Sequence, residues 1–387
     1  YCGEITSSNL KEEVTICGWI HRRRDHGGVI FLDVRDIKGI CQAVVNPDNE
    51  ESFKLAESIR NEYVVKIKGD VRKRLEGTIN KNMHTGEIEI EVKDLIILSK
   101  ANTPVFPIDE YQEVNEDVRL KNRVLDLRRP EMNERIITRS KITSLIRNYL
   151  DKNDFHEIET PILTKATPEG ARDYILPSRV QPGSFYALPQ SPQLFKQLLM
   201  IGGLDKYYQI ARCFRDEDLR ADRQPEFTQI DIEASFIDQD EIMMISEKMI
   251  KDIIKEFCGD KLEKFKKINW HDAMRDYGCD KPDLRIPLKL VDISELVKDE
   301  EFKVFSEPAQ KKESRVVALK VPKGNSLSRG QIDDYTKFVS KLGAKGLAYI
   351  KINDVNDLEN GIQSPILKFL KPETVTNIIK SLDTKTD

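Results

Sequence analysis

A charged loop between two alternating runs holds the residues of this sequence that are best suited to chemistry. Apolar and polar residues alternate over 208–215 and again over 227–233, which predicts two strands that the loop joins into a hairpin. Side chains alternate between the two faces of a strand. One face of the hairpin should therefore carry a cation, an aromatic ring, an amide and two carboxylates: Arg215, Phe227, Gln229, Asp231 and Glu233. Such a set suits a site for a nucleotide together with an amino acid.

The first hundred residues predict a separate small β-barrel. They contain five β-like runs, at 14–20, 29–34, 40–45, 63–69 and 88–92. An amphipathic helix is predicted between the third and fourth runs, at 51–60. Three strands, a helix and two strands follow the order of an OB-fold barrel, and another small β-barrel is the alternative.

The remaining sequence predicts a linker and two further regions. Residues 101–118 contain two prolines and several acidic residues, which is typical of a linker. An amphipathic helix follows over 136–150, and further helices are predicted at 193–201 and 240–257. Beyond residue 280 short strands and helices alternate, which indicates a separate α/β segment.

Composition excludes some classes of protein. Hydrophobic residues make up 39% of the 387 residues, charged residues 33%, and the mean hydropathy is -0.50. No stretch approaches the ~20 apolar residues of a membrane helix. The six cysteines form no Cys-x-x-Cys, so we predict no metal site and reduced thiols in a cytoplasm. Because the net charge is -4, a nucleic acid must be held by local basic patches.

Three segments, 164–174, 187–197 and 214–231, carry a resemblance to a known family. They resemble bacterial-type aspartyl-tRNA synthetase, a class II aminoacyl-tRNA synthetase. The run Leu219-Arg-Ala-Asp-Arg-Gln-Pro-Glu-Phe-Thr228 favours the aspartyl branch over the asparaginyl and lysyl relatives, which share the core Phe-Arg-x-Glu. In this resemblance, residues 135–161 correspond to motif 1, which builds a homodimer interface, and residues 207–233 to motif 2.

The resemblance implies an α+β multidomain fold. Its expected parts are an N-terminal OB-fold anticodon-binding barrel (1–102), a hinge (103–128), the N-terminal part of a class II antiparallel-sheet catalytic domain (129–279) and part of an α/β insertion domain (280–387).

The activity that the resemblance implies is an aspartate-tRNA ligase. ATP would activate L-aspartate to aspartyl-adenylate, and the aspartyl group would then pass to tRNA(Asp). Arg215 would be the catalytic residue, stabilising charge at the α-phosphate. The implied aspartate-binding residues are Glu169, Ser191, Gln193, Lys196, Arg215, Gln229 and Asp231, and the implied ATP-binding residues are Arg215, Asp216, Glu217, Gln224 and Phe227. Taken singly, these residues have alternatives: a solvated ion pair of Arg215 with Glu217, an ordinary helix-surface charge for Lys196, or core packing of Phe227.

The barrel matches the family at positions that read the tRNA anticodon: Arg22, Arg24, His26, Phe31, Gln42, Gly77 and Glu89. Phe31 would stack on a base, and the arginines would contact phosphates. A solvated basic turn with a core phenylalanine is the alternative. His and Gly also occur at the positions of His26 and Gly77 in family members that charge both tRNA(Asp) and tRNA(Asn), so the sequence suggests a second tRNA substrate.

Motif 3 of the family, a glycine-rich Gly-x-Gly-x-Asp-Arg run, does not occur in this sequence. The magnesium-binding carboxylates lie in the same region of the family, so Mg²⁺ is expected only in the intact enzyme, with no ligand here. We therefore expect a fragment that is inactive alone, and robust ATP-pyrophosphate exchange by the 387-residue chain would contradict this. The alternative is a non-enzymatic paralogue that binds tRNA or single-stranded nucleic acid through its OB barrel.

Overall fold

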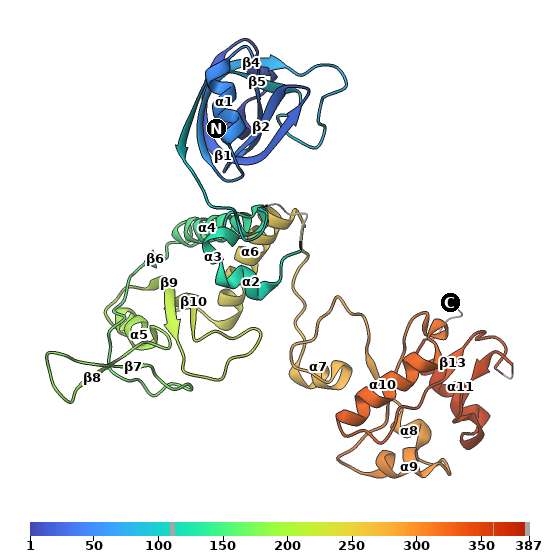
Figure 1. Ribbon diagram of the computed structural model, residues 1–387. Helices are drawn as coiled ribbons and strands as arrows, with labels where there is room; N and C mark the ends of the chain where they lie inside the picture. The colour runs from blue at the N-terminus through green and yellow to red at the C-terminus, as the bar shows by residue number, and fades with distance from the viewer. Residues whose placement is uncertain (109–112, 359, 384–387) are drawn as a thin grey trace. The chain divides into compact units, whose positions relative to one another are not determined.

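A computed structural model describes residues 1–108, 113–358 and 360–383 of the chain (Figure 1). The chain divides into two compact units, Tyr1–Leu262 and Glu263–Asp387, which are described separately below. The predicted boundary at 279/280 lies inside the second unit and stays a prediction.

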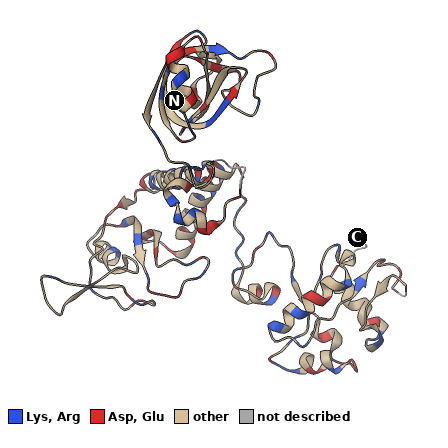
Figure 2. Ribbon diagram, viewed as in Figure 1, with Lys and Arg blue, Asp and Glu red and all other residues tan. Residues whose placement is uncertain are grey.

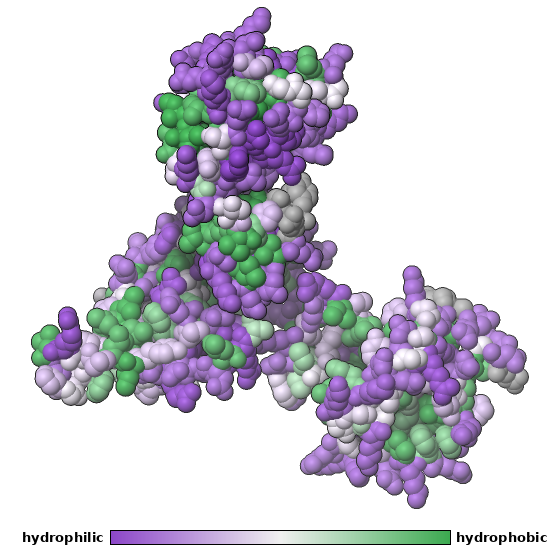
Figure 3. Space-filling model, viewed as in Figure 1, coloured by the Kyte–Doolittle hydropathy of each residue, from purple (hydrophilic) through white to green (hydrophobic). Residues whose placement is uncertain are grey.

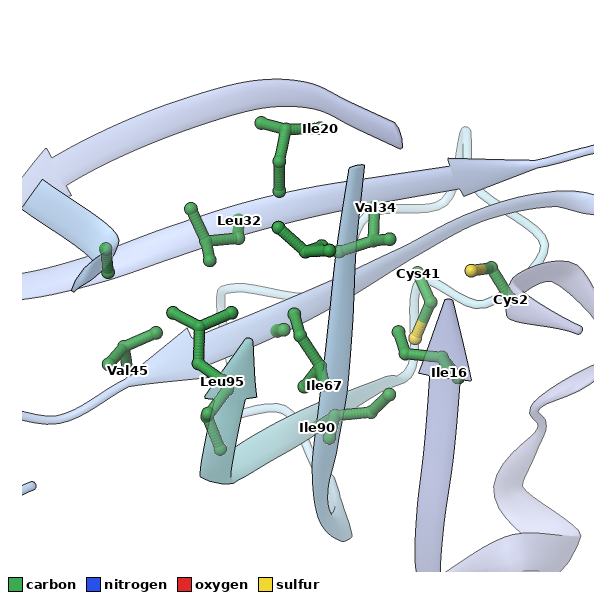
Figure 4. Close-up of a cluster of buried hydrophobic side chains, with 14 of the residues drawn as sticks. Cys2, Ile16, Ile20, Leu32, Val34, Cys41, Val45, Ile67, Ile90 and Leu95 are labelled. Carbon is green, nitrogen blue, oxygen red and sulfur yellow. The ribbon is translucent and has the colours of Figure 1, made fainter. Parts of the chain in front are cut away.

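The N-terminal region is a closed five-stranded barrel, as the OB-fold interpretation predicts. The strand order around the barrel is β1-β2-β3-β5-β4, and β3 and β5 are the parallel pair that closes it. Its interior is filled by aliphatic side chains, with Ile20, Leu32, Ile67 and Ile90 fully buried (Figure 4). The elements are η1 (Cys2–Glu4), η2 (Ser7–Asn9), β1 (Glu13–His26), β2 (Val29–Asp36), β3 (Gly39–Val45), α1 (Glu50–Ser58), β4 (Val64–Lys73) and β5 (Ile88–Ser99).

A bulge in β1 reverses which of its side chains face outward. Ile20 pairs with Val34, but Arg22 pairs with Asp33, so one extra residue interrupts the alternation. Beyond the bulge, Arg22 and Arg24 lie on the outer face of the barrel. The strand ends at a two-residue turn, Gly27-Gly28, whose φ angles of 63° and 81° favour glycine in a tight hairpin.

The rest of the first unit is built on a three-stranded sheet of order β10-β9-β6. The predicted hairpin is confirmed, because β9 and β10 pair antiparallel with Asp231 opposite Gln209, while β6 pairs parallel to β9. The elements are α2 (Glu116–Lys121), α3 (Arg123–Asp126), α4 (Pro130–Asp151), β6 (His156–Glu157), β7 (Ile175–Pro177), β8 (Phe185–Ala187), α5 (Gln193–Ile201), β9 (Lys206–Phe214), β10 (Glu226–Ala234) and α6 (Gln239–Cys258).

Helices α4 and α6 cover one face of this sheet. Leu150, Tyr208 and Met249 form a buried cluster there, and Ile210 and Ile232 of the hairpin pack against it. Because neighbouring side chains on a strand point to opposite faces, the polar residues of β9 and β10 are left for the other face. The packing of the apolar side chains of β9 and β10 against α4 and α6 thus leaves the opposite face of the sheet for a polar site.

The second unit mixes helices with two-stranded sheets around two small hydrophobic clusters. The alternation of short strands and helices predicted beyond residue 280 is present in the described residues. The elements are α7 (Trp270–Tyr277), β11 (Leu290–Asp292), α8 (Ser294–Val297), α9 (Lys303–Gln310), β12 (Val317–Leu319), η3 (Gly324–Ser326), α10 (Arg329–Lys341), β13 (Lys351–Ile352), β14 (Ile362–Gln363), η4 (Leu367–Phe369) and α11 (Pro372–Ser381).

The distribution of charged residues agrees with the small net charge of -4. Figure 2 shows acidic and basic residues interspersed along the ribbon, and Figure 3 shows a largely hydrophilic surface broken by apolar patches. In the described part of the chain, no helix is long and apolar enough to cross a membrane.

Candidate active site and nucleic-acid face

The polar face of the β9-β10 hairpin receives a lysine from α5. Lys196 Nζ donates to Asp231 Oδ1 at 2.9 Å and lies 3.3 Å from Glu233 Oε2. Lys196 and Asp231 are only 9% and 8% exposed. The second oxygen of Asp231, Oδ2, is buried and has no hydrogen-bond partner among the described residues. An ammonium carries three donors, so these two contacts leave Lys196 one hydrogen for a ligand.

Lys196 keeps its charge at neutral pH. Burial is the largest influence on its pKa and lowers it, but the hydrogen bonds and charges of Asp231 and Glu233 together outweigh burial and raise the pKa above the ordinary value of a lysine. The pair with Asp231 therefore stabilises the fold at neutral pH. That contribution is lost only as pH rises above the ordinary lysine range.

Arg215 and Phe227 meet where the two strands open into the loop. The guanidinium carbon lies 5.0 Å from the centroid of the Phe227 ring, a cation-π contact. The Arg215 backbone N–H donates to Pro225 O at 2.9 Å, which fixes the base of the loop. Arg215 Nε is buried without a partner among the described residues, so it is an unused donor. This pair joins a cation and an aromatic surface, as the sequence predicts.

Cys213 lies on the same face but is not a nucleophile. Its Sγ donates to Gln229 Oε1 at 3.2 Å, which places Gln229 beside it. Burial raises the pKa of the Cys213 thiol to about 11, so it stays protonated at neutral pH.

The loop after β9 is held mainly by exposed contacts. Glu217 pairs with Arg223 at 3.3 Å, and both side chains are exposed. The Asp216 backbone N–H donates to Arg172 O at 3.0 Å, which links this loop to the segment before β7. Gln224 is exposed. The structure thus unites Arg215 and Phe227 and leaves Asp216, Glu217 and Gln224 along the loop.

Glu169 lies against the segment that leads into α5. Ser191 Oγ donates to its carboxylate, at 3.2 Å from Oε2 and 3.3 Å from Oε1. Gln193 is the first residue of α5, two positions further on. Four of the seven predicted aspartate-binding residues therefore form two contacting pairs, Lys196 with Asp231 and Glu169 with Ser191.

On the barrel, several predicted anticodon residues form one network. Arg24 Nη2 donates to Asp33 Oδ1 at 2.8 Å and to Gln42 Oε1 at 3.1 Å. Gln42 Nε2 in turn donates to Glu89 Oε2 at 3.0 Å. The Arg24 guanidinium lies 5.9 Å from the centroid of the Phe31 ring, which is half-buried. Polar groups and an aromatic ring thus share a face suited to unstacked bases.

Two family models match the chain. The model of tRNA synthetases class II (D, K and N) matches residues 115–370, and that of the OB-fold nucleic acid binding domain matches residues 14–98. The chain belongs to the class II tRNA synthetases of the D, K and N group. The aminoacyl-tRNA ligase family and the OB-fold expectation are thereby confirmed, and the amino acid is left to be assigned.

Solved structures of two members of this synthetase group resemble the chain. Asparaginyl-tRNA synthetase from Pyrococcus horikoshii, complexed with asparaginyl-adenylate, is 27% identical with a TM-score of 0.59, over 73% of this chain and 63% of that one. A second structure of that enzyme is 27% identical with a TM-score of 0.55, over 66% and 56%. A putative aspartyl-tRNA synthetase from Leishmania major Friedlin shows the same fold at 23% identity and a TM-score of 0.58, over 65% and 51%. The chain thus spans 51–63% of the length of these structures.

The structure places the remaining predicted anticodon residues, Arg22, His26 and Gly77, in the strands and loops of the barrel. Arg22 pairs with Asp33 in the register of β1 with β2, so its side chain lies on the same outer face of the barrel as Asp33. His26 ends β1 at the hairpin tip. Gly77 has a φ of 88° in the loop between β4 and β5, with open space around it.

Two buried polar residues of the synthetase, Arg74 and Gln190, were not identified as candidate functional residues from the sequence alone. Arg74 is 6% exposed, donates through Nε to Ile88 O at 2.9 Å, and has a buried Nη2 without a partner among the described residues. Such a donor could meet a base carbonyl or a phosphate oxygen. Gln190, next to Ser191, is buried and fully hydrogen-bonded. Gln190 lies in the segment 187–197 that carries the resemblance, but nothing in the sequence predicts that either side chain is buried, because burial follows from tertiary packing.

Synthetases of class II use ATP and Mg²⁺ in general. Over the ranges that the structure describes, no three His, Cys, Asp or Glu side chains gather as metal ligands would. We therefore assign no magnesium ligand and derive no step through a metal.

Proposed function

We propose that this synthetase is an aspartate-tRNA ligase of the bacterial type, which activates L-aspartate with ATP and charges tRNA(Asp). The observation that carries the proposal is the buried pair of Lys196 and Asp231. The pair offers one free ammonium hydrogen beside one unpartnered carboxylate oxygen. L-aspartate has the complementary groups, a side-chain carboxylate and an α-ammonium. Asparagine would present an uncharged amide to Lys196 and lose a charge-assisted hydrogen bond.

The proposed activation needs positioning and charge stabilisation. The aspartate α-carboxylate attacks the α-phosphate of ATP, pyrophosphate leaves, and no protein nucleophile takes part, which agrees with the protonated Cys213. Arg215, with its unused buried Nε donor, would stabilise the charge on the α-phosphate, and the Phe227 ring would stack on adenine.

Amino-acid-dependent ATP-pyrophosphate exchange tests this proposal. The assay uses the full-length enzyme, that is, the whole polypeptide that the gene encodes. Aspartate should support exchange at least about a hundredfold better than asparagine, because a site built for a charged partner strongly rejects the neutral analogue. Equal exchange with both amino acids, or a preference for asparagine or lysine, would refute the assignment.

We propose that the outer face of the barrel binds the anticodon loop. Phe31→Ala should weaken binding of a tRNA(Asp) anticodon stem-loop by ~1–3 kcal/mol, because one base loses its stacking surface. Ile37→Ala, which removes an exposed apolar side chain elsewhere on the barrel, is the matched control and should leave affinity unchanged. Fluorescence anisotropy measures both, and equal affinities for the two variants would remove Phe31 from the interface.

The residues His26 and Gly77 support tRNA(Asn) as a second substrate of the proposed ligase. The full-length enzyme should then aspartylate a tRNA(Asn) transcript, measured with radiolabelled aspartate. Incorporation no faster than the background without tRNA would limit the enzyme to tRNA(Asp).

A cytoplasmic homodimer through motif 1 completes the proposal. Ile136 of α4, and Ile162 and Leu163 just after residue 161, expose between 47% and 56% of their surface, which favours burial against a second copy. All six cysteines are unpaired, as a reducing compartment requires.

A further inference from the structure

Gln190 is an almost completely buried amide, 1% exposed, in the segment that leads into α5. Its Nε2 donates to Ala171 O at 2.8 Å and to Asp173 Oδ1 at 2.5 Å, and its Oε1 accepts from the Ala171 backbone N–H at 3.0 Å. Both hydrogens and the oxygen of this amide are therefore hydrogen-bonded to residues 171 and 173. A side chain here pairs with a loop backbone much as a neighbouring strand would.

The segment that carries Gln190 is itself fixed to the sheet. Pro189 O accepts from the Phe214 backbone N–H at 2.9 Å, at the end of β9. This bond does not involve the Gln190 side chain. Loss of the amide should therefore loosen the loop and leave the segment in place.

The loop has a second anchor on its other side. Arg172 Nε donates to Asp216 O at 3.2 Å, and the Asp216 backbone N–H donates to Arg172 O at 3.0 Å. Because this anchor is independent of Gln190, a variant without the amide should hold the loop loosely without losing it. The effect on the loop is then graded, and the fold should survive.

We infer that Gln190 is a positioning residue, which holds the loop of residues 167–173 against the start of α5 and so sets the position of the Glu169 carboxylate. Glu169 lies on Ser191, the neighbour of Gln190, so the clamp acts at the point where the loop meets the helix. This inference rests on the proposed function for its ligand, aspartate. A loop that is ordered before binding spares the ligand the entropy of ordering it.

Hydrogen exchange on the unliganded 387-residue chain tests the clamp without any ligand. In Gln190→Leu, which is close in size and has no polar atoms, the amide of residue 171 should exchange at least about tenfold faster, because its acceptor is gone. Gln197→Leu, at an exposed position of α5, is the matched control and should leave this amide unchanged. Equal protection in the wild type and Gln190→Leu would overturn the inference.

Steady-state exchange kinetics on the full-length enzyme separate positioning from general damage. Gln190→Leu should raise KM for aspartate about tenfold and change KM for ATP and the unfolding midpoint little. Gln190→Glu keeps an acceptor for Ala171 but loses both donors beside Asp173, so it should not rescue binding. An unchanged KM for aspartate in Gln190→Leu would refute the inference and leave the proposed function intact. A wild-type enzyme that does not activate aspartate would refute the proposed function, and the hydrogen-exchange result would then decide whether Gln190 holds the loop.

Discussion

Lys196→Met should weaken binding of L-aspartate at least about a hundredfold, because the ligand's side-chain carboxylate loses its charged donor. The substitution also leaves the buried Asp231 carboxylate without its cation, at a position where no other partner is described for Oδ2. Isothermal titration with aspartate measures the effect. Binding of the tRNA anticodon stem-loop to the barrel should not change.

Lys248→Met on α6 is the matched control for this variant, since it removes an exposed lysine by the same change. Lys196→Arg provides a second comparison, because it keeps the charge and changes only the geometry. Lys196→Met would disprove the role of this lysine if it bound aspartate as the wild type does. Intact binding of the stem-loop shows that the barrel is folded, and an unchanged unfolding midpoint shows the same for the rest of the variant.

Arg215→Ala should lower the rate of aspartyl-adenylate formation by about 10²–10³, because Arg215 would be the donor aimed at the charge that develops on the α-phosphate. The loss should appear in kcat and less in KM for aspartate, since the interaction strengthens in the transition state. Single-turnover pyrophosphate release by the full-length enzyme measures it.

Arg212→Ala is the appropriate control, because Arg212 lies on the same strand but forms an exposed pair with Glu226 at 2.9 Å. A surface pair of this kind contributes little to stability. If Arg212→Ala and Arg215→Ala reduced the rate equally, the effect would come from damage to β9, and the catalytic role of Arg215 would be lost.

The β9-β10 hairpin could be predicted because its pattern is local in the sequence. The alternation of apolar and polar residues fixes which side chains share a face, and the register of β9 with β10 follows it. The contact of Arg215 with Phe227 follows from that placement. The barrel order was predictable for the same reason, since five β-like runs and one helix permit few arrangements.

The rest depends on contacts between distant segments. A bulge after Ile20 turns the side chains of Arg22 and Arg24 outward, yet no residue of β1 predicts a bulge at this position. Lys196 could have been an ordinary helix-surface charge, and only the packing of α5 on the hairpin buries it beside Asp231. The hydrogen bonds of the Gln190 amide and the unpartnered Nη2 of Arg74 likewise follow only from the folded structure of the described residues.

A crystal structure of the enzyme with a non-hydrolysable aspartyl-adenylate analogue tests the central claim most directly. It should place Lys196 Nζ within hydrogen-bond distance of the aspartyl side-chain carboxylate and Asp231 Oδ2 within hydrogen-bond distance of the α-ammonium. The adenine should lie on the Phe227 ring. An aspartyl group bound away from Lys196, with the pair to Asp231 unchanged, would contradict the assignment of aspartate to this site.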